Sequence, residues 1–183
     1  ASVAQPAAAG QDPPRLPVPE ISSEGLNLKI AMDLLREGEI DEKTALKRCE
    51  PNKLDELLHP VFDKAAQKQA KVLTRGLPAS PGAACGQVVF FADDAARWHE
   101  EGHQVIMVRI ETSPEDLAGM TAAEGILTAR GGMTSHAAVV ARGMGKCCVS
   151  GAGAININYK ERTLEIDGVV LREGDYISLN GST

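Results

Sequence analysis

One short stretch of the sequence, GGMTSHAAVVARG from Gly131 onward, contains a histidine where a helix is expected to begin. The two glycines give the backbone the freedom to turn sharply, and Thr134 or Ser135 can cap the helix that follows. His136 then lies in the first helical turn, where free backbone N–H groups and the positive end of the helix dipole stabilise an anion. A neutral imidazole is a good nucleophile, and a phosphoryl group on its nitrogen needs such donors. The spacing therefore predicts a phosphohistidine at His136.

The residues alone also allow a plainer interpretation of this stretch. Short motifs occur by chance, so His136 could be an ordinary polar residue near a helix start, with glycines that only shape a turn. The surrounding pattern favours a strand, a turn and a helix. Residues 125–128 are an apolar run of strand type, and apolar residues recur at helical spacing from Ala137 to Met144.

Residues 131–151 resemble the phosphohistidine signature of the phosphoenolpyruvate-utilising enzymes. Within that family, the sequence is most similar to the pyruvate, phosphate dikinases, and the resemblance spans about residues 24–183. Three further stretches carry it, in the same order along the chain: residues 76–84, 111–116 and 171–175. The resemblance implies the swivelling β/β/α phosphohistidine fold, with His136 as the carrier histidine.

The resemblance also implies a function for the chain as a central phosphoryl-carrier domain. Enzymes of this kind interconvert ATP, phosphate and pyruvate with AMP, pyrophosphate and phosphoenolpyruvate, through pyrophosphoryl- and phosphoryl-histidine intermediates. The carrier would move between a nucleotide-binding domain and a Mg²⁺-dependent pyruvate/phosphoenolpyruvate-binding domain, and this sequence contains neither. We therefore expect a piece of a longer chain that binds no Mg²⁺ itself and does not turn over alone.

Several residues around the histidine are given supporting roles by the same resemblance. Hydroxyl groups would hydrogen-bond the imidazole or the phosphate, glycines would keep the approach open, and an arginine would offset negative charge. In plant members of the family, the threonine two residues before the histidine is a site of regulatory phosphorylation, which implies a regulatory kinase or phosphatase as a partner. The residues concerned are Thr134 (also the regulatory position), Ser135, Gly131, Gly132, Gly143 and Arg142.

Two alternative functions are compatible with the sequence. Phosphoenolpyruvate synthase and enzyme I of the sugar phosphotransferase system share similar histidine cores, but they usually carry Arg where this chain has Met133. A requirement for inorganic phosphate would distinguish the dikinase from both. The second alternative is a noncatalytic interaction module of the same fold, which acid-labile labelling of His136 would exclude.

Length and composition exclude several classes of protein for this chain. A chain of 183 residues can hold one core of typical size, about 100–150 residues, and a smaller appendage. The net charge of −6, without a basic stripe, argues against nucleic-acid binding, and no run of about 18 apolar residues could span a membrane. The four cysteines form neither a metal pair nor a secreted disulfide framework, and no cluster converges on His99 and His103. We expect reduced thiols, no metal site and a soluble intracellular protein, in the cytosol, a plastid or a glycosome.

The chain divides into three predicted regions. The composition predicts a Pro- and Ala-rich tail or linker over residues 1–20, a helical linker segment over residues 21–74 and the phosphohistidine domain over residues 75–183. Alternating strands and helices in the last region predict an α/β fold with a mixed sheet. The expected helices are at 23–38, 41–49, 51–60, 61–73 and 93–101, after Ser113 and after His136. The expected strands are at 87–91, 104–110, 125–128, 147–150, 163–166, 169–171 and 176–179.

Overall fold

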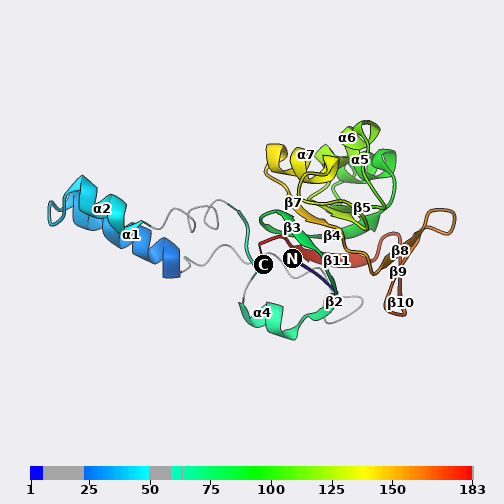
Figure 1. Cartoon of the computed structure of the whole chain (residues 1–183), viewed down its shortest axis with the longest axis horizontal. Coiled ribbons are helices and arrows are strands. Elements are labelled where there is room, and N and C mark those ends of the chain that lie inside the picture. The colour runs from blue at the N-terminus through cyan, green and yellow to red at the C-terminus, as the bar shows by residue number, and fades with distance from the viewer. Residues whose placement is uncertain (6–22, 50–58, 63, 183) are drawn as a thin grey trace.

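The computed structural model describes residues 1–5, 23–49, 59–62 and 64–182 (Figure 1). Helices α1 (Ser23–Arg36) and α2 (Glu42–Arg48) pack against each other as a hairpin beside the body that contains the sheets. Asp41 caps α2, because its carboxylate accepts a 2.9 Å hydrogen bond from the N–H of Thr44. The helices predicted over residues 23–38 and 41–49 are thus confirmed.

Eight strands form one mixed sheet: β1 (Ser2–Gln5), β2 (Lys71–Arg75), β3 (Leu77–Ser80), β4 (Ala83–Val89), β5 (Val105–Arg109), β6 (Gly125–Thr128), β7 (Cys147–Ser150) and β11 (Tyr176–Asn180). Their order is β2-β1-β11-β4-β5-β6-β7-β3. The four central strands β4 to β7 are parallel, so each pair needs a crossover connection. Helices α5 (Ala92–Glu100), α6 (Leu117–Ala122) and α7 (His136–Met144) lie on these three connections, and the short 3₁₀ helix η1 (Pro114–Asp116) precedes α6.

A second, three-stranded antiparallel sheet follows β7 in the chain. It consists of β8 (Ile155–Asn158), β9 (Thr163–Ile166) and β10 (Val169–Arg172), in the order β10-β9-β8. Its alternating pattern, with Leu164 and Ile166 buried and Glu165 exposed, places one face in a core and the other in solvent.

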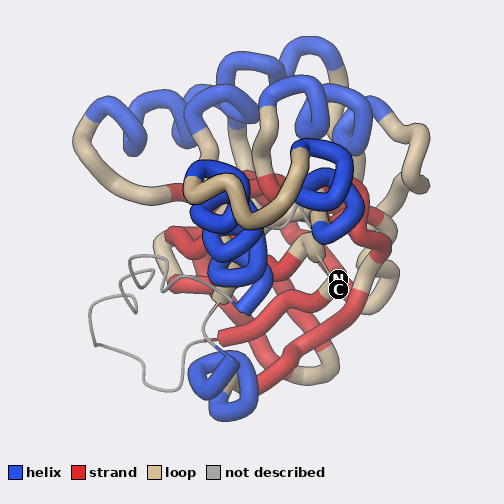
Figure 2. The backbone as a smooth tube through the Cα atoms, turned by 90° about the vertical axis from the view of Figure 1, so that its left-hand side faces the viewer, coloured by secondary structure: helices blue, strands red, loops and turns tan. Residues whose placement is uncertain are grey.

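Two cores lie on opposite faces of the large sheet. In β5, Met107 packs with the residues of the helical layer, whereas its neighbour Ile106 packs with those of the small sheet. Figure 2 shows the group of helices that contains α5, α6 and α7 above the strands, whereas the other helices lie in front of the strands and below them. The domain therefore has a helical layer, a central sheet and a small sheet, and the predicted α/β class with a mixed sheet is confirmed.

The structure differs from the sequence-based prediction at the start of the chain. The tail or linker expected over residues 1–20 begins instead with β1, which lies between β2 and β11 with Val3 fully buried. Beyond Gln5, that expectation falls on residues outside the described part, and so do residues 51–58 of the helix expected over 51–60, whereas His59 and Pro60 are described and are not helical. The helix predicted over residues 61–73 is wrong at both ends, because Val61 and Phe62 are not helical and the helix ends at Gln69. Helix α4 (Lys64–Gln69) stops before β2, where Val72 is exposed and Leu73 is buried.

Candidate functional site

The turn between β6 and α7 places the predicted nucleophile. Gly131 has a φ of 109°, a backbone angle that residues other than glycine rarely adopt. A Cβ atom added to it would lie 2.9 Å from Cβ of Ser135. Ser135 caps α7, since its Oγ accepts a 3.4 Å hydrogen bond from the N–H of Ala138. The predicted strand, turn and capped helix are confirmed, and His136 is the first residue of α7.

A hydrogen bond from a neighbouring loop fixes the imidazole of His136. Oγ1 of Thr112 lies 3.0 Å from Nδ1 of His136, and both side chains are partly buried. Among the described residues, no hydrogen bond is made to Nε2 of the same ring. This arrangement engages one ring nitrogen in the protein and leaves the other free to react.

The hydroxyl of Thr112 reaches His136 because of the sheet topology. Arg109 at the end of β5 is paired with Thr128 at the end of the parallel strand β6, so the loops that follow both strands meet at one edge. Sequence reasoning missed Thr112 as a site residue, although residues 111–116 carried part of the family resemblance. The signal available in the sequence was a hydroxyl residue just after the strand predicted over 104–110, but the pairing of that strand with 125–128 is visible only in the structure.

The other predicted site residues have more varied surroundings. Thr134 is exposed, and its side chain makes no hydrogen bond among those seen within the described residues. Arg142 donates from Nε to the carbonyl oxygen of Ala138 at 3.2 Å and from Nη2 to that of Met133. The guanidinium thus holds the backbone of the turn. Of the predicted set, the structure brings Gly131 and Ser135 together directly before His136, whereas Gly132 and Gly143 have open space where a Cβ would point.

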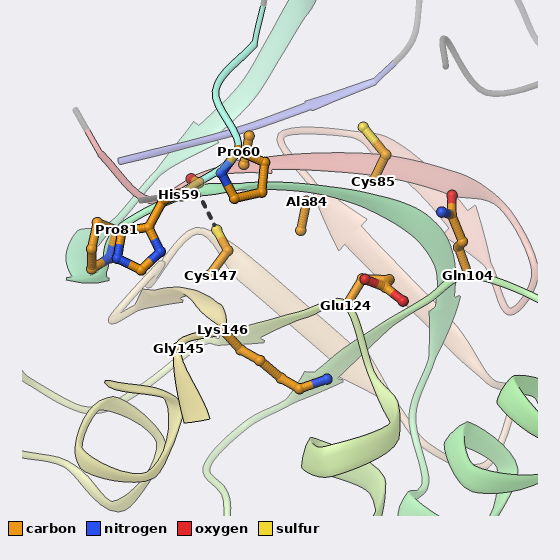
Figure 3. Close-up of a pocket in the computed structure, with 12 residues that line it drawn as sticks. His59, Pro60, Pro81, Ala84, Cys85, Gln104, Glu124, Gly145, Lys146 and Cys147 are labelled. Atoms are coloured by element: carbon orange, nitrogen blue, oxygen red, sulfur yellow. Dashed lines mark hydrogen bonds between the residues drawn. The ribbon is translucent and has the colours of Figure 1, made fainter. Parts of the chain in front are cut away.

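A small cavity lies at the opposite edge of the sheet (Figure 3). Its volume is about 150 Å³, and Gln104, Glu124 and Lys146, which directly precede β5, β6 and β7, contribute to its wall. Burial lowers the pKa of the Lys146 ammonium, which donates to the carbonyl oxygen of Ala123. Because His136 follows the other end of β6, this cavity is separate from the predicted phosphohistidine.

The paired cysteines are core residues on the two faces of the sheet. Cys147 packs with the side of the small sheet and Cys148 with the helical side, and both are free thiols. Burial raises the pKa of Cys147 to about 12 and that of Cys148 to about 11. Neither thiol lies in a setting that activates it as a nucleophile.

Comparison with known proteins identifies the relatives of the chain. Residues 101–183 match the family described as PEP-utilising enzyme, mobile domain. Over 156 residues, or 85% of the chain, it is 60% identical to pyruvate, phosphate dikinase 2 of Zea mays and 62% identical to pyruvate, phosphate dikinase of Clostridium symbiosum. The chain is a homologue of the pyruvate, phosphate dikinases. It spans 18% of the length of each of these two proteins, and 16% of the chloroplastic enzyme of Flaveria pringlei, to which it is 60% identical.

The match confirms the family resemblance predicted from the motifs. His136, Thr112 and the turn between β6 and α7 all fall within the residues that match the mobile domain. Homology to that domain of the dikinases supports a phosphoryl-carrier domain in a phosphotransferase family. None of the described helices is long and apolar enough to cross a membrane.

Proposed function

We propose that this chain is the central, swivelling carrier domain of a pyruvate, phosphate dikinase and that Nε2 of His136 carries the phosphoryl group. The observation that supports it most directly is the 3.0 Å contact between Nδ1 of His136 and Oγ1 of Thr112 at the start of α7. With Nδ1–H donating to Thr112, the Nε2 lone pair stays available as the nucleophile.

The chemistry at His136 is a displacement at phosphorus. The Nε2 lone pair forms a bond to phosphorus while the P–O bond to the leaving oxygen breaks, and that oxygen keeps the electron pair. In the forward direction, ATP would give a pyrophosphoryl-histidine and AMP. Inorganic phosphate would then take the terminal phosphoryl group as pyrophosphate, and the enolate oxygen of pyruvate would take the remaining one to form phosphoenolpyruvate.

The start of α7 supplies stabilisation for the anion formed on His136. The first N–H groups of a helix have no partner within it, and the helix dipole adds partial positive charge at this end. Phosphoryl transfer depends mainly on positioning and on such charge stabilisation. In this proposal, Ser135 caps the first turn of α7, and Gly131 lets the backbone pass close to Ser135. Arg142 donates to carbonyl groups of the turn and the helix and adds positive charge nearby.

Other parts of the longer enzyme would provide the substrate sites. The nucleotide-binding and pyruvate/phosphoenolpyruvate-binding domains are the proposed partners. The segment with α1 and α2 is the proposed helical linker, whereas β1 and β2 belong to the sheet of the carrier, so residues 71–74 of the linker predicted over 21–74 are part of the carrier domain. Mg²⁺ would polarise the transferred phosphoryl groups in those domains. Within the described residues, no group of three His, Cys, Asp or Glu side chains is placed to hold a metal ion, so no step here is assigned to Mg²⁺.

Regulation at Thr134 is part of the same proposal. The side chain is exposed and lies two residues before His136, in the turn that precedes α7. A phosphate there would bring about −1.5 to −2 charges next to the donors that the transferred group needs. A regulatory kinase would in this way switch off the site, and a phosphatase would restore it.

The deciding experiment is acid-labile labelling of the full-length dikinase from radioactive phosphoenolpyruvate. His136→Asn should fold normally and lose the label, whereas His99→Asn, at an exposed histidine of α5, should keep it. Equal labelling of both variants would refute the assignment. A dependence of AMP formation on inorganic phosphate would separate the dikinase from phosphoenolpyruvate synthase and enzyme I.

A further inference from the structure

The loop that carries Thr112 is held at its first residue by the small sheet. The hydroxyl of Tyr159, which follows β8, accepts a 2.9 Å hydrogen bond from the N–H of Ile110. The ring of Tyr159 is itself fixed between two aromatic neighbours. It packs edge-on against Phe90 at 6.5 Å and tilted against Phe91 at 5.7 Å between ring centroids.

The other end of the loop is held by Asp116. Its Oδ2 accepts hydrogen bonds from the N–H of Ser113 at 2.9 Å and from the hydroxyl of Ser113 at 3.3 Å. The Asp116 side chain is only 7% exposed, so an ordered partner for its charge is needed, and Nη2 of Arg109 lies 3.4 Å from Oδ1. Residues 110–113 are thus anchored on both sides of Thr112.

Arg109 joins the two anchors. Besides pairing with Asp116, its guanidinium lies over the ring of Tyr159, 5.2 Å from the ring centroid, and Nη1 donates to the carbonyl oxygen of Phe90 at 3.1 Å. The planar fork of arginine satisfies three directed contacts at once, which the ammonium of lysine does not reproduce. Tyr159, Arg109 and Asp116 therefore form one rigid support under the loop.

We propose that Tyr159 and Arg109 are positioning residues for His136, acting through Thr112 to keep the proton on Nδ1 and the lone pair on Nε2. The effect on phosphoryl transfer rests on the proposed function. The effect on the position of the ring proton of His136 does not depend on that function. The hydrogen bond made by one ring nitrogen of a histidine decides which of the two nitrogens holds the proton. A displacement of the loop by about 1 Å is enough to lose a directed hydrogen bond of this kind and to slow transfer.

Direct nitrogen NMR of the unphosphorylated chain, with ¹⁵N in its histidine rings, tests the structural part. Thr112→Val removes the acceptor and should shift His136 toward the Nε2–H tautomer, while Thr112→Ser should restore the native ring signals. Tyr159→Phe keeps the aromatic ring but loses the hydroxyl group. Arg109→Lys keeps the positive charge but loses the planar guanidinium and its several N–H donors. Both should move the His136 signals in the same direction as Thr112→Val.

The matched control is Tyr176→Phe, at the other tyrosine of the chain, which lies in β11 and makes no side-chain hydrogen bond among those described. It should leave the His136 signals unchanged. In the full-length enzyme, Tyr159→Phe should slow labelling of His136 by about 10-fold, mainly through kcat rather than KM, because substrates bind elsewhere.

The outcomes separate this proposal from the proposed function. Native His136 ring signals in both Tyr159→Phe and Arg109→Lys would overturn the positioning role, whatever His136→Asn does. Altered ring signals together with full labelling of His136→Asn would overturn the carrier assignment and leave the structural coupling intact. Altered signals with unchanged labelling kinetics in Tyr159→Phe would refute the catalytic part of the positioning role.

Discussion

The two glycines before the histidine should respond differently to the same substitution. Gly131 has a φ of 109°, and its added Cβ would lie 2.9 Å from Cβ and 3.0 Å from Oγ of Ser135. At Gly132, φ is not positive and no atom lies within 4 Å of the added Cβ. Gly131→Ala should therefore damage the turn, whereas Gly132→Ala should not.

The size of the Gly131→Ala effect follows from two terms. Holding alanine in a backbone conformation that it rarely adopts costs about 1–3 kcal/mol. Moving the Ser135 side chain to relieve the overlap weakens its hydrogen bond to the N–H of Ala138, and losing a helix cap costs about 1 kcal/mol. We expect a decrease of about 2–4 kcal/mol in the free energy of unfolding, against a change within about 1 kcal/mol for Gly132→Ala.

Urea unfolding of the chain measures the first effect, and labelling of the full-length enzyme measures its consequence at His136. Gly131→Ala should fall in stability with an unchanged m-value and should also label poorly at temperatures where it stays folded. Gly132→Ala should resemble the native protein in both assays. Equal stability of the two variants would show that the turn does not depend on the conformation of Gly131.

The remaining predictions concern charge at the turn and the buried thiols. Thr134→Asp should retain a native circular dichroism spectrum yet lose most labelling of His136, whereas Thr134→Val should label substantially; full labelling of the acidic variant would exclude electrostatic control. Because the pKa of Cys147 is raised from 9.0 to about 12 and that of Cys148 to about 11, the unfolded state loses thiol protons first as the pH rises above about 9. The free energy of unfolding should fall there by about 1.4 kcal/mol per pH unit and thiol. Cys147→Ala should make that fall shallower, and a slope identical to that of the native protein would refute the assignment.

The local part of the site could be predicted from the sequence because its determinants are close together in the chain. Gly131, Ser135 and His136 lie within six consecutive residues, and the turn, the cap and the helix start depend mainly on these residue types. The alternating strands and helices of the domain likewise follow from local apolar patterns. These features agree with the structure, except that β4 spans Ala83–Val89 instead of the predicted 87–91 and that β3 and β8 were not predicted.

The missed features depend on contacts between distant residues. β1 has too short a pattern to predict, and it becomes a strand because β2 and β11 offer edges on both sides. Thr112 is 24 residues from His136, and Tyr159 is 49 residues from Ile110. Neither hydrogen bond can therefore be predicted from the spacing of neighbouring residues. Arg142 was predicted to offset charge, but its contacts with carbonyl groups became visible only with the turn in place.

The placement of the chain connections also bears on the proposed movement of the carrier between two sites. A Cβ on Gly82 would lie 3.6 Å from Cβ of His59, and the N–H of Gly82 donates to Oγ of Ser182 at 3.0 Å. Residues from both flanks of the domain thus meet just before β4, at the edge where the parallel strands begin, while His136 follows the opposite end of β6. If the proposed movement is a rigid rotation about an axis that passes through Gly82 and lies across the parallel strands, the displacement of each residue grows with its distance from that axis. Gly82 itself lines the cavity at Lys146, so in such a rotation His136 would move further than the residues of that cavity, which is what the proposed carrier role requires.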